Sequence, residues 1–173
     1  MDIYVIVLRL IHIFSGIFWV GTSFFLYFFL QPGVKAAGPA GGAVMGRIST
    51  SRFPMVIGLA ALFTVLAGFL LYWKDSGGLQ LDFITSSAGI MLTLGALGGI
   101  VAFGVSFGVQ MPVTLRMAAI QKAAQASGQP PTPAQMQELQ VLGKRMEVAT
   151  RWGVIFMIIA VIGMATAREL GNF

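Results

Sequence analysis

The single histidine of the chain, His12, lies with Arg9 in a long apolar stretch near the N-terminus. Together with Gly16, Trp19 and Ser23, these residues follow spacings of three and four, which places them on one face of a helix. Ionisable side chains are costly inside a membrane, so such a pair favours a functional interpretation. Neutral imidazole is a common metal ligand and an axial ligand of haem. The first chemistry to consider is therefore cofactor binding at His12.

A haem b group would fit this helix face in a coherent way. With an outer membrane boundary near Tyr4 and a rise of about 1.5 Å per residue, His12 lies roughly 12 Å into the membrane. Arg9 is one turn nearer the boundary, where a guanidinium would meet haem propionates. Gly16 would leave clearance for a flat macrocycle, and Trp19 would form a packing wall beside it.

The sequence offers no second histidine as a partner for His12. Met91 and Met164 are expected at a similar depth, and a thioether can ligate haem iron. Alternatively the iron is five-coordinate, or His12 of a second copy supplies the sixth bond across a twofold interface. Each methionine taken singly is more typical of packing.

A structural interpretation of the same residues stays open. The histidine and arginine could hydrogen-bond to carbonyls or serines of neighbouring helices, and Arg9 could extend outward to lipid phosphates. Other chemistries lack their residues: no glycine-rich phosphate loop is visible, and no cysteine can hold metal. A site with several histidines is excluded within one chain.

The elements that carry these residues are membrane-spanning helices. Of 173 residues, 57% are hydrophobic and 10% are charged, and the mean hydropathy is +0.85. Such a composition predicts an all-α integral membrane protein, a four-transmembrane-helix bundle forming one domain over residues 1–173. A helical cytoplasmic extension, 113–150, is expected between the third and fourth spans. The four spans are predicted at about 3–30, 53–74, 84–112 and 151–168.

Charge placement predicts the orientation of the spans. The net charge is +5, and most of the basic residues fall in the loops after the first and third spans. By the positive-inside rule, both termini lie outside and these loops lie in the cytoplasm, as in a bacterial inner membrane. Basic residues beside lipid indicate the bilayer as partner, and no nucleic acid is expected.

Local signals divide the chain further. Pro32 is expected to end the first span, and residues 43–51 to form a short interfacial helix. The segment 128–133 should interrupt the third long helix. Thr132 or a neighbouring residue is expected to cap the next helix, which then continues without a break into the fourth span. Small residues at Gly95-x-x-x-Gly99 and Gly104-x-x-x-Gly108 predict close helix packing in the third span.

The motif Leu10-Ile-His12-x-x-x-Gly16-x-x-Trp19-x-Gly21 resembles a group of small four-span bacterial membrane proteins. The group includes CopD-like copper-resistance domains, HemJ-type protoporphyrinogen oxidases and a four-span family described as a domain of unknown function. The resemblance implies a b-type haem or a metal held by His12. HemJ-type enzymes pair their histidine with an intramembrane lysine, whereas here the predicted spans contain no lysine apart from Lys74, the last residue of the second span.

These observations define three hypotheses. The leading one is a membrane haem-binding, cytochrome b-like protein that transfers electrons with quinone or a partner subunit. The alternative is a cofactor-free accessory or assembly subunit of a larger membrane complex, or of a homodimer. A copper-handling membrane protein is the third. Whether the chain is an enzyme is left open.

Overall fold

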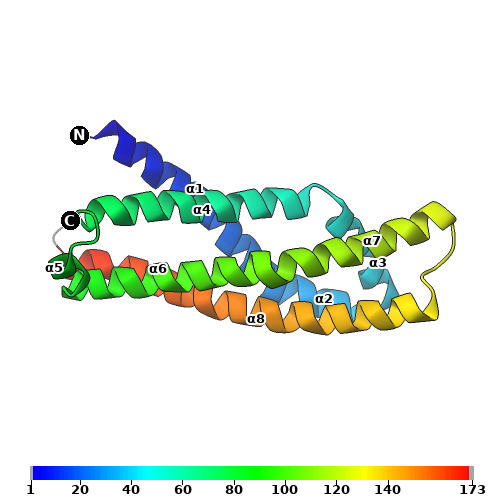
Figure 1. Cartoon of the computed structure of the whole chain (residues 1–173). Helices are drawn as coiled ribbons and strands as arrows, with labels where there is room; N and C mark the ends of the chain where they lie inside the picture. The colour runs from blue at the N-terminus through cyan, green and yellow to red at the C-terminus, as the bar shows by residue number, and fades with distance from the viewer. Residues whose placement is uncertain (1, 172–173) are drawn as a thin grey trace.

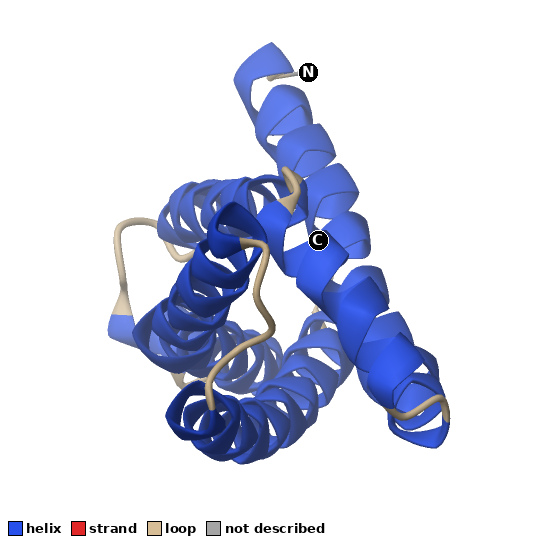
Figure 2. Cartoon of the chain, turned by 90° about the vertical axis from the view of Figure 1, so that its right-hand side faces the viewer, coloured by secondary structure: helices blue, strands red, loops and turns tan. Residues whose placement is uncertain are grey.

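The computed structural model describes residues 2–171, and its regular secondary structure is entirely helical. Four helical segments are long and apolar enough to cross a membrane, which confirms the predicted all-α fold with four such helices. They form an elongated bundle with both chain ends at one extremity, and the first helix crosses the others obliquely (Figures 1 and 2). The four segments are Ile3–Ala36, Phe53–Asp75, Ser87–Ser127 and Pro133–Leu170.

The first long helix continues past the proline that was expected to end it. It comprises α1 (Ile3–Phe25), a π turn η1 (Leu26–Leu30) and α2 (Gln31–Ala36). In the π turn, the backbone N–H of Gln31 bonds to the Leu26 carbonyl five residues back. A proline normally breaks a helix because it lacks an N–H and its ring meets a carbonyl four residues earlier. The widened turn shifts the carbonyl register, so Pro32 is accommodated.

The third long helix uses the same arrangement. After the short α5 (Leu81–Ile84), it runs through α6 (Ser87–Val105), the π turn η2 (Ser106–Gln110) and α7 (Met111–Ser127). Here the Met111 N–H bonds to Ser106, and Pro112 follows directly. The helix therefore extends well beyond the apolar part of the sequence.

The two remaining long helices begin and end at recognisable signals. Helix α4 (Phe53–Asp75) has proline in its first turn, and α8 (Pro133–Leu170) starts at a capping box formed by Thr132 and Gln135. Gly128, with φ of 64°, ends α7 before it. The predicted cap and the unbroken helix into the fourth apolar segment are both present. The short helix expected at 43–51 is α3 (Pro39–Thr50).

The bundle consists of two helix pairs, α1 with α4 and α6 with α8. In the second pair, Gly95 and Gly98 of α6 face α8 so closely that a Cβ on either would lie 2.9–3.3 Å from α8 atoms. Among residues 2–171, nothing lies within 4 Å of such an atom at Gly104 or Gly108, so this half of the glycine pattern makes no close helix contact there. The central core, which joins both pairs, is formed by Trp19, Ala61, Ala102 and Met157.

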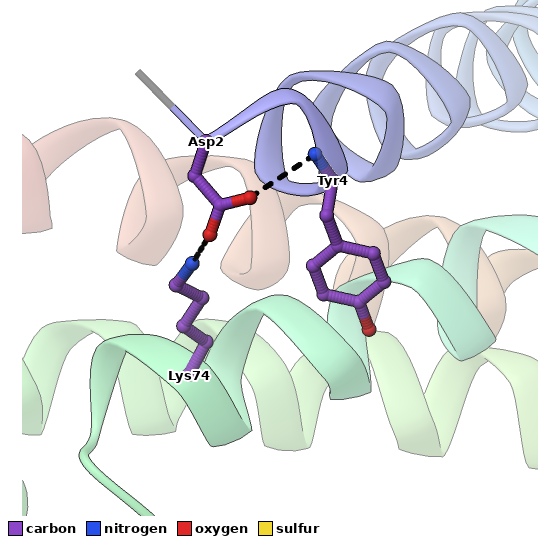
Figure 3. A network of polar contacts seen from close by, with 3 residues as sticks. All are labelled: Asp2, Tyr4 and Lys74. Atoms are coloured by element: carbon purple, nitrogen blue, oxygen red, sulfur yellow. Dashed lines mark hydrogen bonds and ion pairs between the residues drawn. The ribbon is translucent and has the colours of Figure 1, made fainter.

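Ion pairs fasten both ends of the bundle. At the end with the termini, Asp2 accepts a hydrogen bond from the Tyr4 N–H and pairs with Lys74 at the end of α4 (Figure 3). At the opposite end, Arg116 of α7 makes two bonds of 2.6 and 2.9 Å to Glu138. Lys35 of α2 lies 2.8 Å from Glu147 of α8. Both glutamates of the polar half of α8 are thus engaged.

Candidate functional site at His12

The His12 ring is held against the backbone of α4. Its Nδ1 lies 2.8 Å from the Thr64 carbonyl oxygen, and His12 is half-buried. A carbonyl can only accept, so Nδ1–H is the donor. In the neutral ring, Nε2 is then the unprotonated nitrogen with a free lone pair.

A glycine makes room for this ring. A Cβ added to Gly68 would lie 2.8 Å from His12 Cε1 and 3.0 Å from Nδ1, so even alanine would displace the imidazole. Gly68 is one helical turn beyond Thr64, and the imidazole ring of His12 packs against both residues. The sequence analysis did not identify either residue.

Hydroxyl groups add a second polar contact between α1 and α4. The Thr64 side chain donates to the Ala60 carbonyl at 2.7 Å and lies 2.9 Å from the Ser15 hydroxyl. The Ser15–Thr64 contact joins polar groups that face each other across an otherwise apolar contact, whereas the Thr64–Ala60 bond lies within α4. Together, the His12–Thr64 and Ser15–Thr64 contacts join one face of α1 to α4 beside the imidazole ring.

The Nε2 atom of His12 is open to a ligand. Within residues 2–171, Nδ1 is the His12 ring nitrogen that makes a hydrogen bond. The same part of the chain contains no buried side-chain nitrogen or oxygen without a partner. In this part of the chain, Nε2 has no hydrogen-bond partner, and no buried side-chain nitrogen lacks one. Nε2 must therefore be exposed at the protein surface. The site therefore leaves Nε2 at the surface of the α1–α4 pair, while Nδ1 is held by the α4 backbone.

The other predicted site residues are distributed differently around α1. Gly16 faces α4, because a Cβ there would lie 3.5 Å from Thr64 Cγ2, so α4 occupies the space beside this glycine. Trp19 is 4% exposed and packs edge-on against Phe103 with ring centroids 6.5 Å apart. Arg9 is exposed and makes no ion pair or hydrogen bond within the described part of the chain.

The two candidate methionine ligands belong to the other helix pair. The backbones of Met91 and Met164 line the close approach of α6 and α8, beside Gly163 and Gly95 respectively. Both side chains are half-buried. Between residues 2 and 171, no group of three or more His, Cys, Asp or Glu residues is placed to hold a metal ion. The site on this chain therefore centres on one imidazole.

Comparison of this chain with protein-family models, curated proteins and solved structures gives no match. The functional argument therefore starts from the geometry of the site. That geometry is an imidazole whose Nδ1 is held by a backbone carbonyl, set in a segment apolar enough to cross a membrane. Such a group can bind a metal centre, or accept a hydrogen bond from a ligand in the lipid phase.

Proposed function

We propose that this chain is a membrane haem-binding, cytochrome b-like protein in which His12 Nε2 is an axial ligand. The observation that supports this most directly is the Nδ1–H bond to the Thr64 carbonyl. Histidines that bind metals commonly donate their second ring N–H to a carbonyl or carboxylate, which fixes the tautomer and raises the basicity of the ligating nitrogen. When bound, the haem would supply one-electron transfer, with quinone or a partner subunit as the second reactant.

The chain's own residues would bind and orient the group. Gly68 and the Thr64 carbonyl position the ring, and Arg9, one turn nearer the N-terminus, offers a guanidinium to the propionates. Trp19 holds α1 in the core below the site. The sixth ligand is either a methionine such as Met91 or Met164, His12 of a second copy, or none.

We further propose a bacterial inner-membrane location with both termini outside. Basic residues gather toward the end of the bundle that carries α3, α7 and the first half of α8, and the chain ends lie at the other (Figure 1). Cytoplasmic loops are rich in Lys and Arg, so this basic end is assigned to the cytoplasm. His12 would then lie in the outer half of the membrane.

The test is a visible absorption spectrum of the detergent-purified protein, oxidised and then reduced with dithionite. A Soret band with sharp reduced α and β bands is expected, and His12→Ala should abolish it while far-ultraviolet circular dichroism stays helical. Two variants of α4 sharpen the test. Thr64→Val keeps the carbonyl and should keep the spectrum, whereas Gly68→Ala displaces the ring and should lose or shift it. Absence of a chromophore under adequate haem supply would sink the proposal.

A second candidate function is a cofactor-free accessory subunit, and Arg9 favours it. Its guanidinium is exposed and without a partner among residues 2–171, in a segment where an unpaired charge is costly. A carboxylate on another membrane protein would relieve that cost. An accessory subunit should be colourless and should co-purify with a larger complex. Arg9→Gln should weaken that association, and His12→Ala should leave it unchanged.

A further inference from the structure

A groove of about 510 Å³ lies between the third long helix and α8, away from His12. One part of its lining is apolar and aromatic, and the other part carries two cations. The lining residues are Val105, Val109, Lys144, Arg145, Val148, Ala149, Trp152 and Phe156. The surface of the groove is therefore almost wholly apolar, and Lys144 and Arg145 line the part that is earliest along α8.

The two cations have no ion-pair partner within the described part of the chain. Lys144 and Arg145 are exposed and make no ion pair there. The acidic residues of the same helix half are already engaged, because Glu138 bonds to Arg116 and Glu147 to Lys35. The positive charge at the groove is thus available to an anion from outside the chain.

The spacing along α8 matches the edge of a membrane. Trp152 begins the apolar part of α8, and tryptophan favours the boundary between hydrocarbon and headgroups. Arg145 lies seven residues earlier, about 10 Å along the helix axis. The headgroup layer of one leaflet is about 5–8 Å thick. A long basic side chain at this position reaches lipid phosphates from the water side.

We propose that this groove binds an anionic phospholipid of the cytoplasmic leaflet. The phosphate would lie at Lys144 and Arg145, and an acyl chain would follow the wall formed by Val105, Val148 and Phe156. Basic pockets beside membrane helices on this side are suited to such headgroups. This inference rests on the proposed membrane orientation and is independent of haem binding, so failure of one leaves the other intact.

Trp152 supplies the probe, because it lines the groove. The full chain is placed in phosphatidylcholine vesicles that contain brominated phosphatidylglycerol or, in parallel, the same fraction of brominated phosphatidylcholine. The quenching of Trp152 is the difference between the parent protein and Trp152→Phe. Retention of phosphatidylglycerol in native mass spectrometry of the parent provides a measurement that needs no tryptophan variant.

Stronger quenching by brominated phosphatidylglycerol is expected in the parent protein. Each cation near a membrane surface favours anionic lipid about fivefold, so the double variant K144Q/R145Q should lower the relative affinity roughly 25-fold. The matched control R47Q/K122Q removes two other exposed positive charges and should keep the preference.

Three results would overturn the proposal. The first is equal quenching by the two brominated lipids, and the second is an unchanged preference in K144Q/R145Q. The third is shielding of Trp152 from both lipids, which would assign the groove to a second copy of this chain.

Discussion

The close contact between α6 and α8 gives a sharp stability prediction, the substitution Gly163→Ala. A Cβ at Gly163 would lie 2.7 Å from two backbone atoms of α6, the Gly95 nitrogen and the Met91 oxygen. Because these are backbone atoms, no side-chain rotation relieves the clash. The helices must separate from 2.7 Å to the 3.4 Å at which ordinary contact begins, a shift of about 0.7 Å.

The expected cost follows from that separation. A gap of this size forfeits roughly a quarter to a half of the dispersion energy of each affected atom pair. Overpacking of a well-packed contact costs about 1–3 kcal/mol, and the backbone contacts place Gly163→Ala toward the upper end. Alanine regains up to about 1 kcal/mol of helix propensity. A net loss of about 1–2 kcal/mol in the free energy of unfolding is therefore expected.

The chain contains its own matched control for this experiment. Gly104→Ala on α6 introduces the same methyl group where nothing lies within 4 Å, so it should gain up to about 1 kcal/mol from propensity alone. The assay is reversible unfolding in mixed micelles with increasing dodecyl sulfate, followed by circular dichroism. The two variants should differ by about 2–3 kcal/mol. Equal stability of the two would refute the close α6–α8 contact.

Two further predictions concern the ends of helices. The Lys74 ammonium, through its hydrogen bond, lowers the pKa of Asp2 below its ordinary value, so the pair stabilises the fold at neutral pH and is lost as pH falls through that lowered pKa. Carbon-13 titration of the aspartate carboxyls should show an upward shift of the Asp2 midpoint in Lys74→Gln, and an unchanged midpoint would contradict the pair. Thr132→Ala removes the α8 capping box, costs about 1 kcal/mol, and should speed hydrogen exchange in the first turn of α8 about fivefold; Thr132→Ser should behave as wild type.

The arrangement of the site was only partly predictable from the helix period. Spacing correctly placed His12 and Gly16 on one face, and both face α4 in the structure. Arg9 is three residues from His12, so it lies about 60° around the helix, enough to leave it exposed. Periodicity defines a face, but it does not say which helix covers that face. Thr64 and Gly68 acquire their role only through that long-range contact.

The ends of the long helices show a similar limit. Thr132 and Gly128 act through local chemistry, and the sequence indicated the resulting helix start and chain break. Pro32 was expected to end a helix by an equally local rule, yet the helix continues through it. The accommodation depends on a change of backbone register in the preceding turn. The side chains of Leu26–Leu30 contain no signal from which this change of register could be predicted.

In the two π turns, Leu26–Leu30 and Ser106–Gln110, the number of residues is constrained more strongly than their identity. A π turn contains one residue more than an α-helical path of the same pitch would need. Deleting any single residue from Leu26–Leu30 would restore an α-helix and remove the shift in carbonyl register that accommodates Pro32, so the proline ring would meet the carbonyl four residues earlier. Over generations, substitutions in these turns would be tolerated where insertions and deletions would be removed by selection.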